Sequence, residues 1–207
     1  MSGSASTAVS ADRWKTGFFA VCALLFLWVC WVDERFLFVP TDPEWTHIAA
    51  YKYVLLLHGL GGLAALVVGA FQFSSRLRAR RPALHRTMGK IYLGACAVGG
   101  PAAFYMQVRN STPLFMPAAL CHSVLWMLAS IMAYWSIRRR KIAMHRAWMM
   151  RSYAMCLIFI VVRIPDAFPA IVIDNAASAV VELVSIVVML VGVEMILSVR
   201  ELTGRAR

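Results

Sequence analysis

Six hydrophobic stretches, each close to the length of a membrane-spanning helix, constrain this chain more than any other feature of its sequence. A helix needs about 20 mostly apolar residues to cross about 30 Å of hydrocarbon. Backbone groups in lipid must be hydrogen-bonded internally, and alternating apolar positions are absent, so the stretches predict helices rather than strands. They cover residues 17–32, 51–73, 88–108, 114–136, 147–165 and 176–199. The sequence therefore predicts an all-α, polytopic membrane protein with six transmembrane helices.

The basic residues gather on one side of these stretches. The chain is 61% hydrophobic and only 15% charged, yet its formal net charge is +11. Of its 21 lysines and arginines, 17 precede the first stretch, join the second to the third or the fourth to the fifth, or follow the sixth. This positive-inside pattern predicts that both termini are cytoplasmic. We expect the basic loops to meet anionic lipid headgroups, and we do not expect a nucleic-acid partner.

The second to fifth stretches predict a central four-helix bundle made of two tandem hairpins. Each hairpin carries a histidine seven or eight residues into its first helix, turns through a basic loop and returns through Ala-(Leu/Met)-His-Arg. A tyrosine follows each His-Arg pair, at Tyr92 and Tyr153. We expect a disordered N-terminus over residues 1–13, one transmembrane domain over 14–200 and a tail over 201–207. The segment from Phe36 to Ala50 is expected to rest at the outer interface.

Two pairs of histidines fall at matching depths in this arrangement. His58 and His122 lie about 10 Å below the outer helix ends, whereas His85 and His145 begin helices at the inner boundary, about 24 Å away. Helix bundles hold haem iron through histidines on facing helices. The sequence therefore predicts up to two haems b, each held by one histidine pair.

The haem hypothesis also predicts a role for two arginines and the kind of electron partner. Arg86 and Arg146 are the expected partners of the haem propionates, through charge-assisted hydrogen bonds. Such a protein carries electrons across or within the membrane and exchanges them with a redox partner or a quinone. Buried charges also need partners, and we expect ion pairs of Arg163 with Glu182 and of Arg151 with Glu194.

A second hypothesis explains the same residues without redox chemistry. Histidine in a membrane helix often bonds a neighbouring helix, and a His-Arg pair at a helix boundary suits a lipid phosphate. The chain is then a small transporter, a lipid-binding protein or an assembly subunit. The five cysteines fit no zinc or disulfide pattern and are expected to pack as small apolar residues, while His47 is expected at the surface.

Three short motifs occupy the middle of the chain. They are Gly69-x-x-Gln72, His85-Arg86-x-x-Gly89-Lys90-x-Tyr92, and His145-Arg146-x-Trp148-Met149-x-Arg151-Ser152-Tyr153, followed by Arg163. Over about residues 50–170 the chain resembles a group of bacterial integral membrane proteins catalogued as domain of unknown function 2306. The resemblance implies a location in the bacterial inner membrane and implies no established activity. The four-histidine plan alone is also similar to that of cytochrome b-561, whose core helices bind two haems.

Overall fold

The computed structural model describes residues 3–32, 34–165, 168 and 174–204, with side chains from residue 16 onward. All regular elements in this part of the chain are helical, which confirms the predicted all-α class. In chain order they are α1 (Gly3–Val32), the short 3-10 helix η1 (Arg35–Phe38), α2 (Glu44–His47), α3 (Lys52–Gln72), α4 (Ser75–Arg80), α5 (Pro82–Asn110), α6 (Met116–Arg138), α7 (Ile142–Arg163) and α8 (Asn175–Leu202). The helical backbone of α1 thus runs through most of the stretch for which we predicted disorder.

Four helices, α3, α5, α6 and α8, are long and apolar enough to cross a membrane. The sequence predicted six such helices, so two of them do not meet this standard. The apolar part of α1 within the described side chains, Thr16–Val32, is shorter than a full span. The remaining helix, α7, carries three arginines (Arg146, Arg151 and Arg163) within one apolar stretch.

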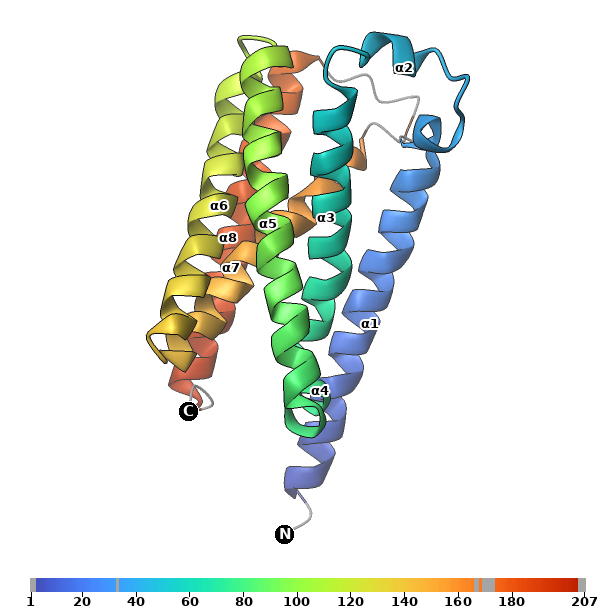
Figure 1. Ribbon diagram of the computed structural model, residues 1–207. Coiled ribbons are helices and arrows are strands. Elements are labelled where there is room, and N and C mark those ends of the chain that lie inside the picture. Colours follow the sequence, from blue (N-terminus) through green and yellow to red (C-terminus); the bar gives the residue numbers. More distant parts are fainter. Residues whose placement is uncertain (1–2, 33, 166–167, 169–173, 205–207) are drawn as a thin grey trace.

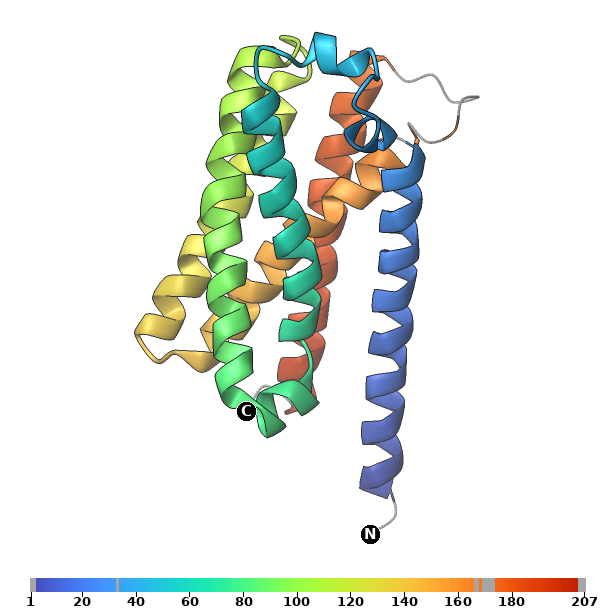
Figure 2. The same cartoon turned by 45° about the vertical axis from the view of Figure 1, so that its right-hand side comes forward.

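The lower hydropathy of α7 follows from its position. It packs against α6, α8, α3 and α1, and Figures 1 and 2 show it running obliquely through the middle of the molecule. A continuous run of its residues, Ser152–Ile158, is buried. A helix that is covered by protein on most sides does not depend on lipid-facing apolar side chains, so it tolerates polar and charged positions.

The helices pack in two hairpins, α3 with α5 and α6 with α7. Helix α5 lies between α3 and α6, α7 also contacts α3, and α8 packs outside against α6 and α7. We call the end with α4, the α6–α7 turn and the last turn of α8 the basic end, and the end covered by η1 and α2 the capped end. The described start of α1 lies at the basic end, like the end of α8 (Figure 1).

Local chemistry explains where several helices begin. Pro82 occupies the first turn of α5 and Pro117 that of α6, where the missing N–H of proline breaks no helical hydrogen bond. The hydroxyl of Ser74 accepts from the N–H of Leu77 at 3.1 Å and caps α4, a helix that the sequence did not predict. The carboxylate of Asp174 accepts from Ala177 at 2.7 Å and caps α8 in the same way.

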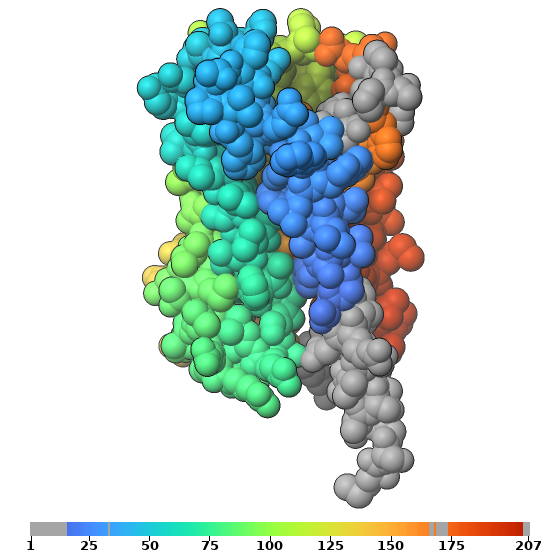
Figure 3. Space-filling model, turned by 90° about the vertical axis from the view of Figure 1, so that its right-hand side faces the viewer, coloured from blue at the N-terminus to red at the C-terminus, as the bar shows by residue number. Residues whose placement is uncertain are grey.

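The segment between α1 and α3 folds over the ends of these helices. The indole N–H of Trp45 lies 3.0 Å from the main-chain oxygen of Phe36, and the two rings meet edge to face at 5.5 Å. Figure 3 shows this segment lying across the capped end above α1 and α3. His47 is exposed there, as predicted for a surface histidine.

Candidate functional site

Two of the four paired histidines lie towards the capped end, one in each hairpin. The Nδ1 of His58 on α3 is 3.0 Å from the main-chain oxygen of Gly99 on α5. The Nε2 of His122 on α6 is 3.0 Å from the main-chain oxygen of Met155 on α7. Each ring therefore donates to the second helix of its own hairpin. The structure brings the two rings near enough for their charges to interact.

A buried carboxylate completes this cluster. Glu182 on α8 is only 5% exposed, and its Oε1 lies 2.5 Å from Nδ1 of His122. Both ring nitrogens of His122 therefore face oxygen atoms, at Glu182 and at Met155. The Met155 carbonyl can only accept, so the pair of His122 and Glu182 shares one further proton between Nδ1 and the carboxylate. An unpaired charge this deeply buried would be strongly unfavourable.

The predicted pairing of Arg163 with Glu182 is wrong. Glu182 pairs with His122, and a guanidinium nitrogen of Arg163 lies 3.4 Å from a carboxylate oxygen of Glu34. Arg163 is the last residue of α7 and lies close to the segment that follows α1. Glu182 lies about two turns from the start of α8 and faces α6. The prediction used depth in the membrane, which both residues nearly share, but depth does not say towards which neighbour a side chain points.

Buried hydroxyl groups link the two hairpins between the histidine levels. The Tyr92 hydroxyl on α5 lies 2.7 Å from the Ser152 hydroxyl on α7, which lies 2.8 Å from that of Ser130 on α6. Tyr153 on α7 donates to the main-chain oxygen of Leu66 on α3 at 3.0 Å. The sequence singled out the two tyrosines by their recurrence. It missed the role of both serines, because a single serine in an apolar helix gives no periodic signal.

We expect Ser152→Ala to lower the free energy of unfolding by about 1 kcal/mol, because interhelical hydrogen bonds in membranes contribute on that order. The change removes the hydroxyl that joins Tyr92 to Ser130, at a position that is fully buried. Reversible unfolding in mixed micelles measures the effect. Ser198→Ala, on the exposed face of α8, is the matched control and should be neutral. Equal losses in the two variants would contradict a role for the hydroxyl link.

The other two histidines lie at the basic end. The Nδ1 of His145 on α7 is 2.9 Å from the main-chain oxygen of Ala133 on α6. His85 on α5 has a buried Nδ1 for which the described residues provide no hydrogen-bond partner. The two rings are near enough for their charges to interact. Arg86 and Arg146 follow these histidines and are both exposed.

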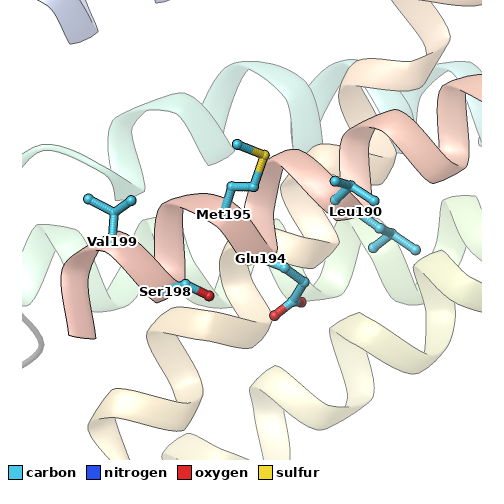
Figure 4. Close-up of a pocket in the computed structure, with 6 residues that line it drawn as sticks. Leu190, Glu194, Met195, Ser198 and Val199 are labelled. Carbon is cyan, nitrogen blue, oxygen red and sulfur yellow. The ribbon is translucent and has the colours of Figure 1, made fainter. Parts of the chain in front are cut away.

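The predicted ion pair of Arg151 with Glu194 is confirmed. Two guanidinium nitrogens of Arg151 contact the two carboxylate oxygens of Glu194 at 2.7 and 3.0 Å. Glu194 stands with Leu190, Met195, Ser198 and Val199 around a shallow, open hollow (Figure 4). All the residues that line the hollow come from α8, so it is a surface feature of one helix rather than an enclosed site.

The cysteines are free thiols, as expected from their spacing. Cys96 and Cys156 are buried in the core, Cys22 and Cys30 are half-buried, and Cys121 is exposed. Within the part of the chain that the structure describes, no group of three or more histidine, cysteine, aspartate or glutamate residues is placed to hold a metal ion.

The three sequence motifs meet in the half of the molecule near the basic end. A methyl group at Gly69 would lie 2.5 Å from ring carbons of Tyr153 and 2.8 Å from the ring of Tyr92. The side-chain oxygen of Gln72 is 3.3 Å from the point where a methyl group at Gly89 would lie. The motifs are therefore in close contact, and the small residues among them allow the helices to approach.

The apolar helices, the one-sided basic charge and the buried polar contacts define a multi-pass α-helical membrane protein. The chain belongs to the family of predicted membrane proteins called DUF2306, whose model matches residues 55–197. This finding confirms the family that the motifs indicated. No curated protein and no solved structure matches the chain.

Proposed function

We propose that this protein binds haem b through two pairs of histidines and carries electrons across or within a bacterial inner membrane. In this proposal His58 and His122 ligate a haem near the capped end, and His85 and His145 ligate a haem near the basic end. Helices α1 and α7 cross the membrane together with the four apolar helices, and both termini are cytoplasmic. Bound haem supplies one-electron chemistry, and a redox partner or a quinone exchanges electrons with it.

The observation that carries the proposal is the direction of the histidine rings. His58 and His145 each use Nδ1 to donate to a main-chain oxygen, at 3.0 and 2.9 Å. Such a bond holds the ring in the tautomer whose Nε2 is a lone-pair donor. Histidines that ligate metals are held in this way, with the second nitrogen bonded to a carbonyl or a carboxylate. One histidine of each proposed haem pair is therefore oriented as a ligand.

The partner histidines fit the same chemistry in different ways. Glu182 holds Nδ1 of His122, as a carboxylate holds many ligating histidines, and ligation through Nε2 would replace the contact with Met155. The Nδ1 of His85 is buried and has no partner among the described residues, so this ring is not committed to another helix. Arg86 and Arg146, exposed beside the pair at the basic end, are the proposed partners of the propionates.

Absorption spectroscopy of the purified protein tests this function. The protein is expressed with ample haem supply, and its spectrum is recorded in detergent, oxidised and then reduced with dithionite. We expect a Soret band, sharp α and β bands on reduction and close to two haems per chain. A well-folded but colourless protein would overturn the proposal and favour a transporter, a lipid-binding protein or an assembly subunit. One haem per chain would overturn the pair at the basic end.

Substitution of single histidines then assigns the ligands. We expect His58→Ala to remove about half of the bound haem, because one of two bis-histidine sites loses an axial ligand. His47→Ala is the matched control, since this exposed histidine lies in α2 outside the bundle, and it should leave the haem content unchanged. The pyridine haemochrome assay, scaled to protein concentration, measures both variants. Full haem retention in His58→Ala would remove the site at the capped end.

A further inference from the structure

Four groups that can carry positive charge lie close enough at the basic end for neighbouring charges among them to interact. Arg78 on α4 and Arg146 on α7 lie within range of each other's charge. The ring of His85 on α5 interacts with the charges of Arg78 and of His145, and that of His145 with Arg146. Three different helices therefore contribute to one cluster, and α4, the short helix that the sequence did not predict, brings Arg78 into it.

This cluster lacks a carboxylate among the described side chains. Of the two glutamates of α8 at this end, Glu194 is bound to Arg151, and Glu201 is exposed and forms no ion pair within the described residues. Partial burial, and then the charge of Arg146, lower the pKa of Arg78 from its ordinary value. Like charges that are held together without a counterion oppose folding, and an anion bound between them removes that opposition.

Two buried polar atoms near the cluster also lack partners. Gln72 at the end of α3 is 8% exposed, and its side-chain Nε2 has no hydrogen-bond partner among the described residues. The Nδ1 of His85 is also buried and has no hydrogen-bond partner among the described residues. Gly89 follows His85 by four residues and so lies on the same face of α5, where the Gln72 side-chain oxygen approaches it. Buried polar groups are rarely left unbonded, so two such donors, one on α5 and one from α3 beside the same face of α5, indicate a ligand.

We propose that Arg78, Arg146, Gln72 and His85 form a binding site for a phosphate group at the basic end of the bundle. The arginine forks match phosphate oxygens, and Gln72 and the His85 ring add neutral N–H donors. His85 would use Nδ1 here, which leaves its Nε2 for iron, and Arg86 would then hold the haem propionates while Arg146 binds the phosphate; the site does not depend on haem. The group comes from an anionic phospholipid headgroup or from free phosphate.

The position of the site in the fold favours a phospholipid headgroup as the source of the phosphate group. His85 and Arg146 lie in the first turns of α5 and α7, at the level where apolar helix surface gives way to basic loops. Phospholipid headgroups occupy this level of a bilayer, and basic pockets between transmembrane helices bind them. The exposed apolar side chains that flank the site, Leu84 and Met144, would contact the acyl chains of such a lipid.

Binding of two probes to the full-length protein in detergent tests the site and separates the sources. The probes are short-chain phosphatidylglycerol below its micelle concentration and inorganic phosphate, followed by calorimetry. We expect Arg78→Gln and Arg146→Gln each to weaken phosphatidylglycerol binding about tenfold or more, because charge-assisted hydrogen bonds are lost. Arg78→Lys should retain part of the affinity. If the lipid binds more tightly than inorganic phosphate, the natural ligand is a phospholipid headgroup. If both probes bind equally, the natural ligand is free phosphate.

The control is Arg80→Gln, an equal loss of charge on the same short helix: both arginines are exposed, but it is the charge of Arg78 that interacts with Arg146 and His85. It should change the affinity by less than about twofold, as expected for a screened surface charge. Equal loss in Arg78→Gln and Arg80→Gln would show a diffuse basic surface and overturn the site, as would failure of both probes to bind. Loss of haem with unchanged binding of both probes would instead assign the arginines to propionates. Thermal unfolding without probe shows that each variant is folded.

Discussion

Gly69→Ala should lower the free energy of unfolding by about 2 kcal/mol, the usual range for overpacking a tight interior. The added methyl group would lie 2.5 Å from the ring of Tyr153 and 2.8 Å from that of Tyr92. Neither ring is free to move, because Tyr92 is fully buried and bonded to Ser152, and Tyr153 is bonded to Leu66. The gain of helix propensity from glycine to alanine, about 1 kcal/mol, offsets only part of this effect.

A second glycine of the same helix provides the control. A methyl group at Gly62 would have no atom within 4 Å, so Gly62→Ala should leave stability unchanged or raise it slightly. Both variants are compared by reversible unfolding in mixed micelles, with tryptophan fluorescence as the readout. If Gly69→Ala proves as stable as Gly62→Ala, the close approach of α3 to α5 and α7 at this point is wrong.

Glu182→Leu should lower the free energy of unfolding by about 3 kcal/mol, the lower end of the range for breaking a buried ion pair. The change removes the carboxylate that shares a proton with His122 and leaves Nδ1 of that ring without a partner in the bundle. Glu182→Gln keeps the shape and a hydrogen-bonding group, so it should destabilise the protein less. Thermal unfolding in detergent, followed by the same fluorescence readout, ranks the three proteins.

An exposed glutamate on the same helix controls for charge. Glu201 lies at the end of α8, so Glu201→Gln removes the same charge from a solvated position and should change stability by no more than about 0.5 kcal/mol. A Glu182→Leu protein as stable as Glu201→Gln would refute the buried pair. If Glu182→Leu alone lowers stability markedly, the contact with His122 is one of the main polar interactions that hold α8 to the bundle.

The ion pairs illustrate how far sequence reasoning reaches. Arg151 and Glu194 were paired from their shared side of the membrane, and the structure joins them through two contacts. The same reasoning failed for Arg163 and Glu182, which are equally close in depth. Depth is a single coordinate that residue number supplies, whereas the rotation of each helix about its axis decides the partner. That rotation follows from packing against several neighbours at once.

The residues of the candidate sites also fall into those that sequence spacing predicted and those that only the packing of the helices revealed. The four histidines and their pairing were predicted from their spacing, because a helix converts residue number into height. Arg78 and Ser130 were missed as site residues, and Gln72 and Ser152 were noticed only as parts of motifs. Each of these residues acquires its role from a helix distant in the sequence, so no local pattern records it.

The sequence alone determined the four apolar helices that are long enough to cross a membrane, their approximate ends and the one-sided basic charge. The thickness of the hydrocarbon and the need to satisfy backbone hydrogen bonds both act along the axis of each helix. They can therefore be recognised from consecutive residues of the sequence. Only the tertiary structure decided that α7 runs through the interior, that Glu182 contacts His122, and that Arg78 comes within range of the charge of Arg146. These outcomes depend on which helix faces close against each other, and close packing is a property of all the helices together.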